Sequence, residues 1–269
     1  MFVRFCETIV GYFFIHQIYT VPMREMLEQI HLNYIKERYN SFPDMRLYTW
    51  KVRKGHARVI NVYSGKRRVE SHRTDTKRGQ ELLRLKDEKE RCAQILSKLE
   101  SEWLARYNCP CETVKITHYG NTENKRFFDS LKERQNSMEF KSDIRYRGLP
   151  YRSKLESDFA RIMDDYGIPY KYEPEILLFD GERKCPDFII YLPWLDLVIL
   201  IEIFGRCDDV NYVKKNNGKH LAYIFSGWLP GHNMLSFYYD DKTPYIPEMI
   251  MEEIETLALR HYLTITGAA

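Results

Sequence analysis

Apolar residues recur at helical spacing in two stretches of the first half of the chain. Residues 23–39 place them three and four positions apart, which predicts an amphipathic helix. Residues 75–107 place them on one face and charged residues on the other, which predicts a long helix that ends before Cys109-Pro110. The charged face is typical of a solvated surface, and DNA binding along it is the alternative.

Apolar and polar positions alternate in the segment between these two helices. Residues 46–72 show this two-residue period, and turn sequences at Lys54-Gly55 and Ser64-Gly65 divide the segment. We therefore predict a small three-stranded β-meander that carries many basic side chains. The candidate contacts to a nucleic-acid backbone in this meander are Lys66, Arg67 and Arg68.

The second half of the chain alternates between helical and strand-like patterns. Helices are expected over residues 153–166, 208–225 and 247–262, and strands over residues 170–179, 184–192, 196–204 and 235–239. The order α-β-β-β-α-β-α is typical of a mixed sheet flanked by helices, so the chain is expected to be of the α+β or α/β class.

These patterns divide the chain into two parts. Residues 1–120 are expected to form an N-terminal region of helix, β-meander and long helix, and residues 151–269 a C-terminal domain. Residues 121–150 are polar without clear periodicity, so we interpret them as a linker that wraps onto the C-terminal domain.

Composition limits the partners and the compartment. The net charge of +3 over 269 residues means that any nucleic-acid surface must be a local patch. Six scattered cysteines without a secretory signal are expected to be free thiols in the cytoplasm. The apolar residues 1–22 contain charged side chains, which favours a buried or partner-facing helix over a membrane span. We expect no membrane partner, and a homodimer is one alternative for the assembly.

Three carboxylates stand at positions that call for an explanation. Glu202 lies near the end of an apolar run that is typical of a buried strand, and Asp187 begins the preceding strand. Glu156 lies in the first turn of the helix before them. A buried ionised Glu costs several kcal/mol unless a partner neutralises it. Antiparallel pairing of the two strands would place Asp187 beside Glu202, with Glu156 above them.

Such a group of oxygen ligands suits Mg²⁺ or Mn²⁺. Each residue also has a structural alternative. Ser153 and Glu156 match a capping box, Asp187 could accept bonds from turn N–H groups, and Glu202 could pair with Arg206 or Lys219. Glu173 and Glu175, on the first strand, are further candidates for this group, but on a half-exposed strand they are expected to be solvated.

The order of these residues resembles that of the PD-(D/E)xK nuclease superfamily, in its phage and mobile-element branches. Pro186-Asp187 matches the PD, Glu202-Ile203 matches the (D/E)x, and Glu156 matches the helix glutamate. The resemblance covers about residues 150–262. It implies a restriction-endonuclease-like fold and hydrolysis of phosphodiester bonds. It also implies a metal held by Asp187, Glu202 and the Ile203 carbonyl, with Glu156 supporting the site.

The chain departs from this pattern at the lysine, because Phe204 stands where the family has Lys. In some branches that lysine lies on the following helix. Lys219 is our first candidate for the role, Lys215 the second and Arg206 the third. Arg206 stays protonated and so could clamp a phosphate but could not act as a base. Lys215 and Arg206 are also candidate nucleic-acid contacts.

Two functions of different classes follow from these residues. The first is a metal-dependent nuclease that acts on nucleic acid, with DNA expected. The second is a non-catalytic nucleic-acid-binding or assembly protein on a decayed nuclease fold, which Phe204 favours. Asp187, Glu202 and Glu156 favour the first, because a site without a metal has no physical reason to keep a Glu in an apolar strand.

Overall fold

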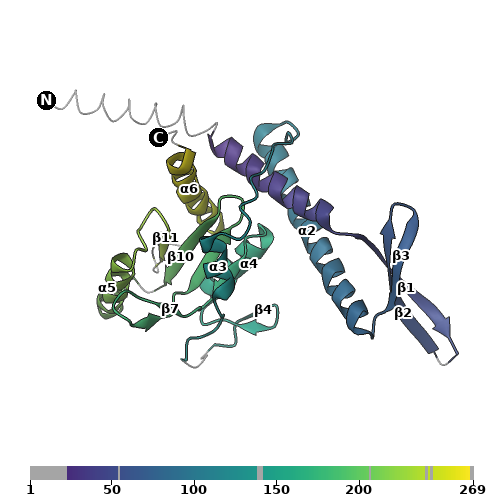
Figure 1. Ribbon diagram of the computed structural model, residues 1–269. Coiled ribbons are helices and arrows are strands. Elements are labelled where there is room, and N and C mark those ends of the chain that lie inside the picture. The colour runs from purple at the N-terminus through teal and green to yellow at the C-terminus, as the bar shows by residue number, and fades with distance from the viewer. Residues whose placement is uncertain are drawn as a thin grey trace. The chain divides into compact units, whose positions relative to one another are not determined.

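The computed structural model describes residues 23–53, 55–137, 142–205, 207–239, 242 and 245–266, without the side chains of Tyr212 and Lys215. The chain is of the mixed α+β class (Figure 1). It divides into two compact units, one of Gln29–Lys115 and one of the described residues of Met1–Glu28 and Ile116–Ala269. The helix expected in residues 1–22 lies outside the described residues, and so does Arg206.

The unit of Gln29–Lys115 contains the expected meander and long helix. The elements are β1 (Asp44–Val52), β2 (Gly55–Ser64), β3 (Arg67–Arg73) and α2 (Lys77–Tyr107), preceded by a helix over residues 23–41. The three strands are antiparallel in the order β1-β2-β3. Thr76 caps the N-terminus of α2, and its side chain accepts a bond from the Gly79 amide. Leu82 of α2 packs against one face of the sheet, onto Met45, Ile60 and Val62.

The other unit is built on a four-stranded mixed sheet of order β11-β10-β9-β6. The strands are β6 (Tyr170–Tyr172), β9 (Phe188–Leu192), β10 (Leu197–Phe204) and β11 (Met234–Tyr238). β6, β9 and β10 pair antiparallel, and β11 pairs parallel to β10. The predicted order of elements is confirmed, but two of the predicted strands are interrupted. Their outer ends form a separate ribbon of β7 (Ile176–Leu177) and β8 (Arg183–Lys184).

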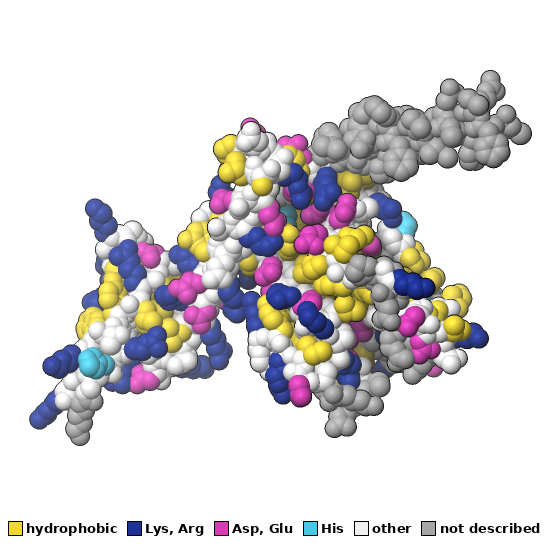
Figure 2. Space-filling view, turned by 180° about the vertical axis from the view of Figure 1, so that it is seen from behind, with side chains coloured by type: hydrophobic (Ala, Val, Ile, Leu, Met, Phe, Trp, Pro, Cys, Tyr) yellow, Lys and Arg dark blue, Asp and Glu magenta, His cyan; other side chains and the backbone are white. Residues whose placement is uncertain are grey.

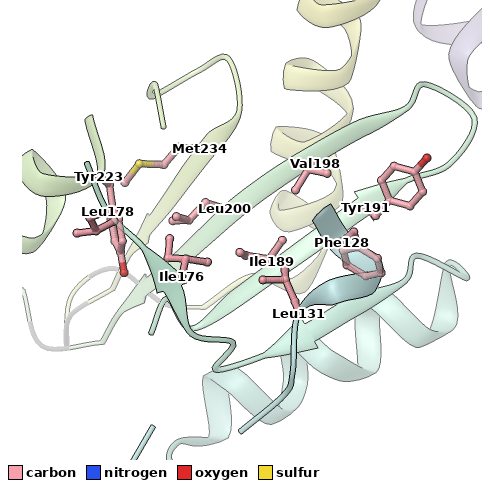
Figure 3. Packing of buried hydrophobic residues seen from close by; sticks show 10 residues of the cluster. All are labelled: Phe128, Leu131, Ile176, Leu178, Ile189, Tyr191, Val198, Leu200, Tyr223 and Met234. Atoms are coloured by element: carbon pink, nitrogen blue, oxygen red, sulfur yellow. The ribbon is translucent and has the colours of Figure 1, made fainter. Parts of the chain in front are cut away.

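Helices cover both faces of this sheet. They are α4 (Lys154–Asp165), α5 (Val210–Phe225) and α6 (Pro247–Thr266). On one face, Phe159 of α4 packs against Phe188, with ring centroids 4.7 Å apart. On the other face, Tyr223 of α5 joins a buried cluster with Leu200 (Figure 3). The whole length of β10 is therefore buried, which explains why its sequence is apolar without alternation.

The polar segment 121–150 contains elements that the sequence did not predict. They are α3 (Glu123–Ser130), β4 (Arg145–Tyr146) and β5 (Leu149–Pro150). Phe128 and Leu131 pack into the buried cluster of Figure 3, so this segment wraps onto the sheet. An eight-residue helix is too short to show a period of its own. Among the described residues, no helix has the length and hydropathy that a bilayer span requires.

Candidate active site

Glu202 is the buried centre of the site. It lies near the end of β10, and only 2% of its surface is exposed. Two residues of α5 bind it: Lys219 Nζ lies 2.7 Å from Oε1, and the Tyr223 hydroxyl donates to Oε1 at 2.9 Å. Lys219 and Tyr223 are four residues apart, so they share one face of α5. The buried carboxylate is therefore paired with the lysine that we ranked first from the sequence.

Asp187 lies beside Glu202 at the start of β9. The antiparallel register pairs Leu200 with Ile189 and Ile201 with Phe188, so the next position brings Asp187 opposite Glu202. Asp187 Oδ2 accepts a hydrogen bond from the Ile203 amide at 2.6 Å. Asp187 keeps some exposure to solvent, whereas Glu202 has almost none. The expected antiparallel pairing of the two strands is confirmed.

Glu156 approaches the site from the first turn of α4. Its Oε2 accepts bonds from the Tyr172 hydroxyl at 2.6 Å and from the Arg152 amide at 3.1 Å. The Ser153 hydroxyl caps the helix by accepting from the Glu156 amide at 3.2 Å. This is a variant of the expected capping box, because the returning bond reaches Arg152 rather than Ser153. Glu156 thus has a structural role at the helix end as well as a place in the carboxylate group.

Glu173 is a fourth carboxylate of this group, and the expectation that it is solvated was wrong. Only 3% of its surface is exposed. Its Oε1 accepts from Arg152 and from Asn136, and its Oε2 is buried without a hydrogen-bond partner. Its amide donates to the Asp187 carbonyl at 2.9 Å, which ties it to the start of β9.

The backbone explains why Glu173 is buried rather than solvated. Its φ of +46° lies in the left-handed region, which is uncommon for a residue other than glycine. This turn ends β6 and directs the side chain inward instead of continuing the strand. Strain of this kind costs of order 1–3 kcal/mol and concentrates at functional sites. No local pattern could have identified the turn, because it depends on the contacts to β9.

Burial makes the carboxyl groups of this cluster hard to ionise. It raises the pKa of Glu202 to about 8 and that of Glu156 to about 7, and in both cases the neighbouring Asp187 carboxylate adds to the shift. Burial also raises the pKa of Asp187. Burial alone would lower the pKa of Lys219, but the carboxylates of Glu202 and Asp187 outweigh it and raise that pKa. The ammonium group therefore stays charged within a group of carboxyls that repel one another.

We expect the stability of the wild-type protein to fall as the pH rises from about 5 to about 8, and Glu156→Gln to make this fall smaller. In this window the unfolded Glu156 has lost its proton, whereas the folded one keeps it until its pKa of about 7, so stability falls as the pH rises. A shift of this size corresponds to about 3 kcal/mol. Burial of His220 and His261 lowers their pKa values and acts in the opposite direction, so the variant must be compared with wild type.

The measurement is urea unfolding of both proteins at several pH values. Gln keeps the acceptor for Tyr172 and Arg152 and removes only the titration. Equal pH slopes for the two proteins would contradict the raised pKa of Glu156.

The remaining predicted residues have different places. The Ile203 amide is engaged by Asp187. Phe204 is buried and stacks on Tyr238, with ring centroids 5.0 Å apart, so an apolar ring fills the position where the resembled family has Lys. Arg206 and the Lys215 side chain lie outside the described residues. Lys66, Arg67 and Arg68 are exposed at the turn between β2 and β3, in the other unit.

Both oxygens of Glu202 and one oxygen of Asp187 are already engaged within the protein. Among the described residues, no group of three or more His, Cys, Asp or Glu side chains is placed to hold a metal ion. Lys219 and Tyr223 bind Glu202, and an amide binds one oxygen of Asp187. A cation at Glu202 would compete with the Lys219 ammonium.

Comparisons of this chain with protein-family models, with curated proteins and with solved structures find no match. The resemblance to nucleases therefore stays a hypothesis. The function must be inferred from the geometry and the chemistry of the site.

Proposed function

We propose that this protein is a metal-dependent nuclease that hydrolyses phosphodiester bonds, with DNA as its substrate. One observation carries the proposal: Lys219 of α5 contacts Glu202, opposite Asp187 at the start of β9. A lysine that enters from the following helix supplies the charge that Phe204 cannot supply from the strand. Two carboxylates and a lysine at adjoining strand ends are the groups that the proposed chemistry needs.

We further propose that the unit around this site is restriction-endonuclease-like. Its mixed sheet has one parallel and two antiparallel pairings and lies between helices on both faces. The site lies where β10 ends and β9 begins, next to the first turn of α4. This arrangement agrees with the order of elements that the resemblance implies.

The residues fit a hard divalent cation by their chemistry. They present carboxylate oxygens, and Oε2 of Glu173 is buried without a hydrogen-bond partner. Burial raises the pKa values of Glu202 and Asp187 because it disfavours their ionised forms, and a cation would stabilise those forms. Asp187, Glu202 and the Ile203 carbonyl would hold Mg²⁺ or Mn²⁺, and Glu156 would support them. When bound, the cation would supply Lewis acidity and lower the pKa of water.

The protein's own groups would then orient the reactants. Lys219 Nζ would direct a water molecule toward phosphorus or offset charge on the phosphate in the transition state. The Tyr223 hydroxyl would hold the Glu202 carboxylate in place, because it donates to Oε1. Glu156, whose pKa is about 7, would hold or release a proton near Asp187 at neutral pH.

We expect the purified chain to cleave DNA in Mg²⁺ or Mn²⁺ and to lose this activity with chelator. Single-stranded, duplex and supercoiled DNA should be compared, with RNA as a further substrate. Mn²⁺ should also raise the melting temperature, because a ligand that binds only the folded state stabilises it. The proposal would be contradicted if the chain showed no cleavage and no thermal shift at every metal concentration tested.

A non-catalytic protein on a decayed nuclease fold is the second candidate. The stacking of Phe204 on Tyr238 favours it, since an apolar contact has replaced the usual lysine position. In that case the ion pair of Lys219 with Glu202 would be purely structural. Binding of DNA without cleavage, together with no effect of Mn²⁺ on stability, would identify this candidate.

A further inference from the structure

The positive charge of the chain is concentrated in one short segment. Residues 44–73 contain nine Lys and Arg and two acidic residues, a net charge of +7. The whole chain has a net charge of +3, so the other residues together carry −4. This segment is the β1–β3 sheet, and Figure 2 shows its Lys and Arg side chains in dark blue. Such a local basic surface is typical of proteins that bind a polyanion.

The two faces of this sheet differ. Ile60 and Val62 of β2 point to the face that Leu82 of α2 covers. Along β1, the opposite face carries Arg46, Tyr48, Trp50 and Val52, since successive side chains alternate between faces. Trp50 is 48% exposed and Tyr48 is 36% exposed. This face therefore carries partly exposed aromatic rings, whereas Leu82 of α2 packs on the other face.

Cross-strand contacts hold this surface in shape. The hydroxyls of Tyr48 and Tyr63 lie 3.2 Å apart, and the Arg46 guanidinium stacks over the Tyr63 ring at 4.6 Å. Arg68 pairs with Tyr63 in the register of β2 and β3, at the edge of the same face. Arg67 and Lys66 continue the positive charge into the exposed turn. The aromatic rings are thus flanked by guanidinium and ammonium groups.

We propose that this face, formed by Tyr48, Trp50 and Tyr63 with Arg68 at its edge and Arg67 in the adjoining turn, binds nucleic acid. Phosphates would contact the basic side chains, and Trp50 and Tyr48 would stack on bases or pack against sugars. The charge complementarity selects a polyanion, and the exposed aromatic rings select one that carries planar bases. This proposal rests on the proposed function only in its choice of nucleic acid as the ligand. Binding at this face does not require cleavage at the carboxylate site.

The test measures binding by fluorescence anisotropy, with a labelled single strand and with its duplex as the two probes. The parent protein is the full chain carrying Glu202→Gln, and chelator is present throughout. Trp50→Ala should weaken binding of the single strand roughly 5- to 150-fold, the range for loss of one base–aromatic stack. Arg67→Ala/Arg68→Ala should weaken both probes and reduce the salt slope by about 1.4 for the single strand and about 1.8 for the duplex.

The matched control is Arg84→Ala/Arg91→Ala, which removes the same charge from exposed positions of α2. This control should change affinity by less than about threefold, since α2 packs on the other face of the sheet and salt screens its exposed charges. Arg67→Ala/Arg68→Ala could be the one variant that weakens binding, and it could do so for the duplex alone. That result would mean that the face holds the backbone of a duplex. No binding by the parent protein, or equal losses in the control and the test variants, would overturn the proposal. Unchanged circular dichroism would establish that each variant is folded.

Discussion

Glu202→Gln is expected to lower the rate of metal-dependent cleavage by at least about 10²-fold while the chain stays folded. The substitution keeps an acceptor oxygen for Tyr223 and removes the negative charge that would hold a cation. Asp187→Asn should have a similar effect, because the same cation would need both carboxylates. The measurement is single-turnover cleavage, together with a Mn²⁺ titration that monitors the melting temperature.

Glu175→Gln is the matched control for this prediction. Glu175 carries the same side chain, lies between β6 and β7, and forms an ion pair with the exposed Arg183. An exposed pair of this kind contributes little to stability, so this variant should resemble wild type in both assays. If Glu202→Gln and Asp187→Asn kept full activity, the chemistry would not occur at this cluster.

Lys219→Ala is expected to abolish most of the activity and to destabilise the protein in a pH-dependent way. Cleavage should fall about 10²- to 10³-fold, the range for loss of one preorganised donor. Below the pKa of Glu202 its carboxyl group is neutral, so removal of Lys219 costs little stability. Above it, the ionised carboxylate would be buried beside Asp187 with only Tyr223 as its partner. The loss of stability should therefore be larger at pH 8.5 than at about pH 6.

Lys214→Ala is the control, since Lys214 is an exposed residue of the same helix. The readouts are cleavage and the free energy of unfolding at both pH values. Full activity in Lys219→Ala would pass the catalytic role to Lys215 or Arg206. A loss of activity without any pH-dependent loss of stability would contradict the ion pair as described.

Local patterns were enough to predict most of the elements of this fold. The alternation in residues 46–72 predicted β1–β3, and the continuous apolar run around Glu202 predicted β10. The reason is physical: a strand between two layers of helices is apolar throughout, and a half-covered sheet alternates. The pairing of Asp187 with Glu202 also followed, because short turns join neighbouring antiparallel strands.

Other features depended on contacts between segments far apart in the chain. α3 is helical within a polar segment because Phe128 packs onto the sheet, and no period announces it. Glu173 is buried because a left-handed residue ends β6 and aims the side chain inward. Neither a packing partner nor a left-handed φ at a glutamate can be read from neighbouring residues.

The sequence by itself determined that Asp187 pairs with Glu202 next to the helix of Glu156, and that a basic meander precedes them. Only the tertiary structure decided what neutralises Glu202. The packing of α5 against the sheet places Lys219 and Tyr223 in contact with the same carboxylate. It also decided that Trp50 and Tyr48 lie on the open face of the meander rather than in its core. Both outcomes depend on how one element packs on another, because burial and charge are properties of an environment and not of a single residue.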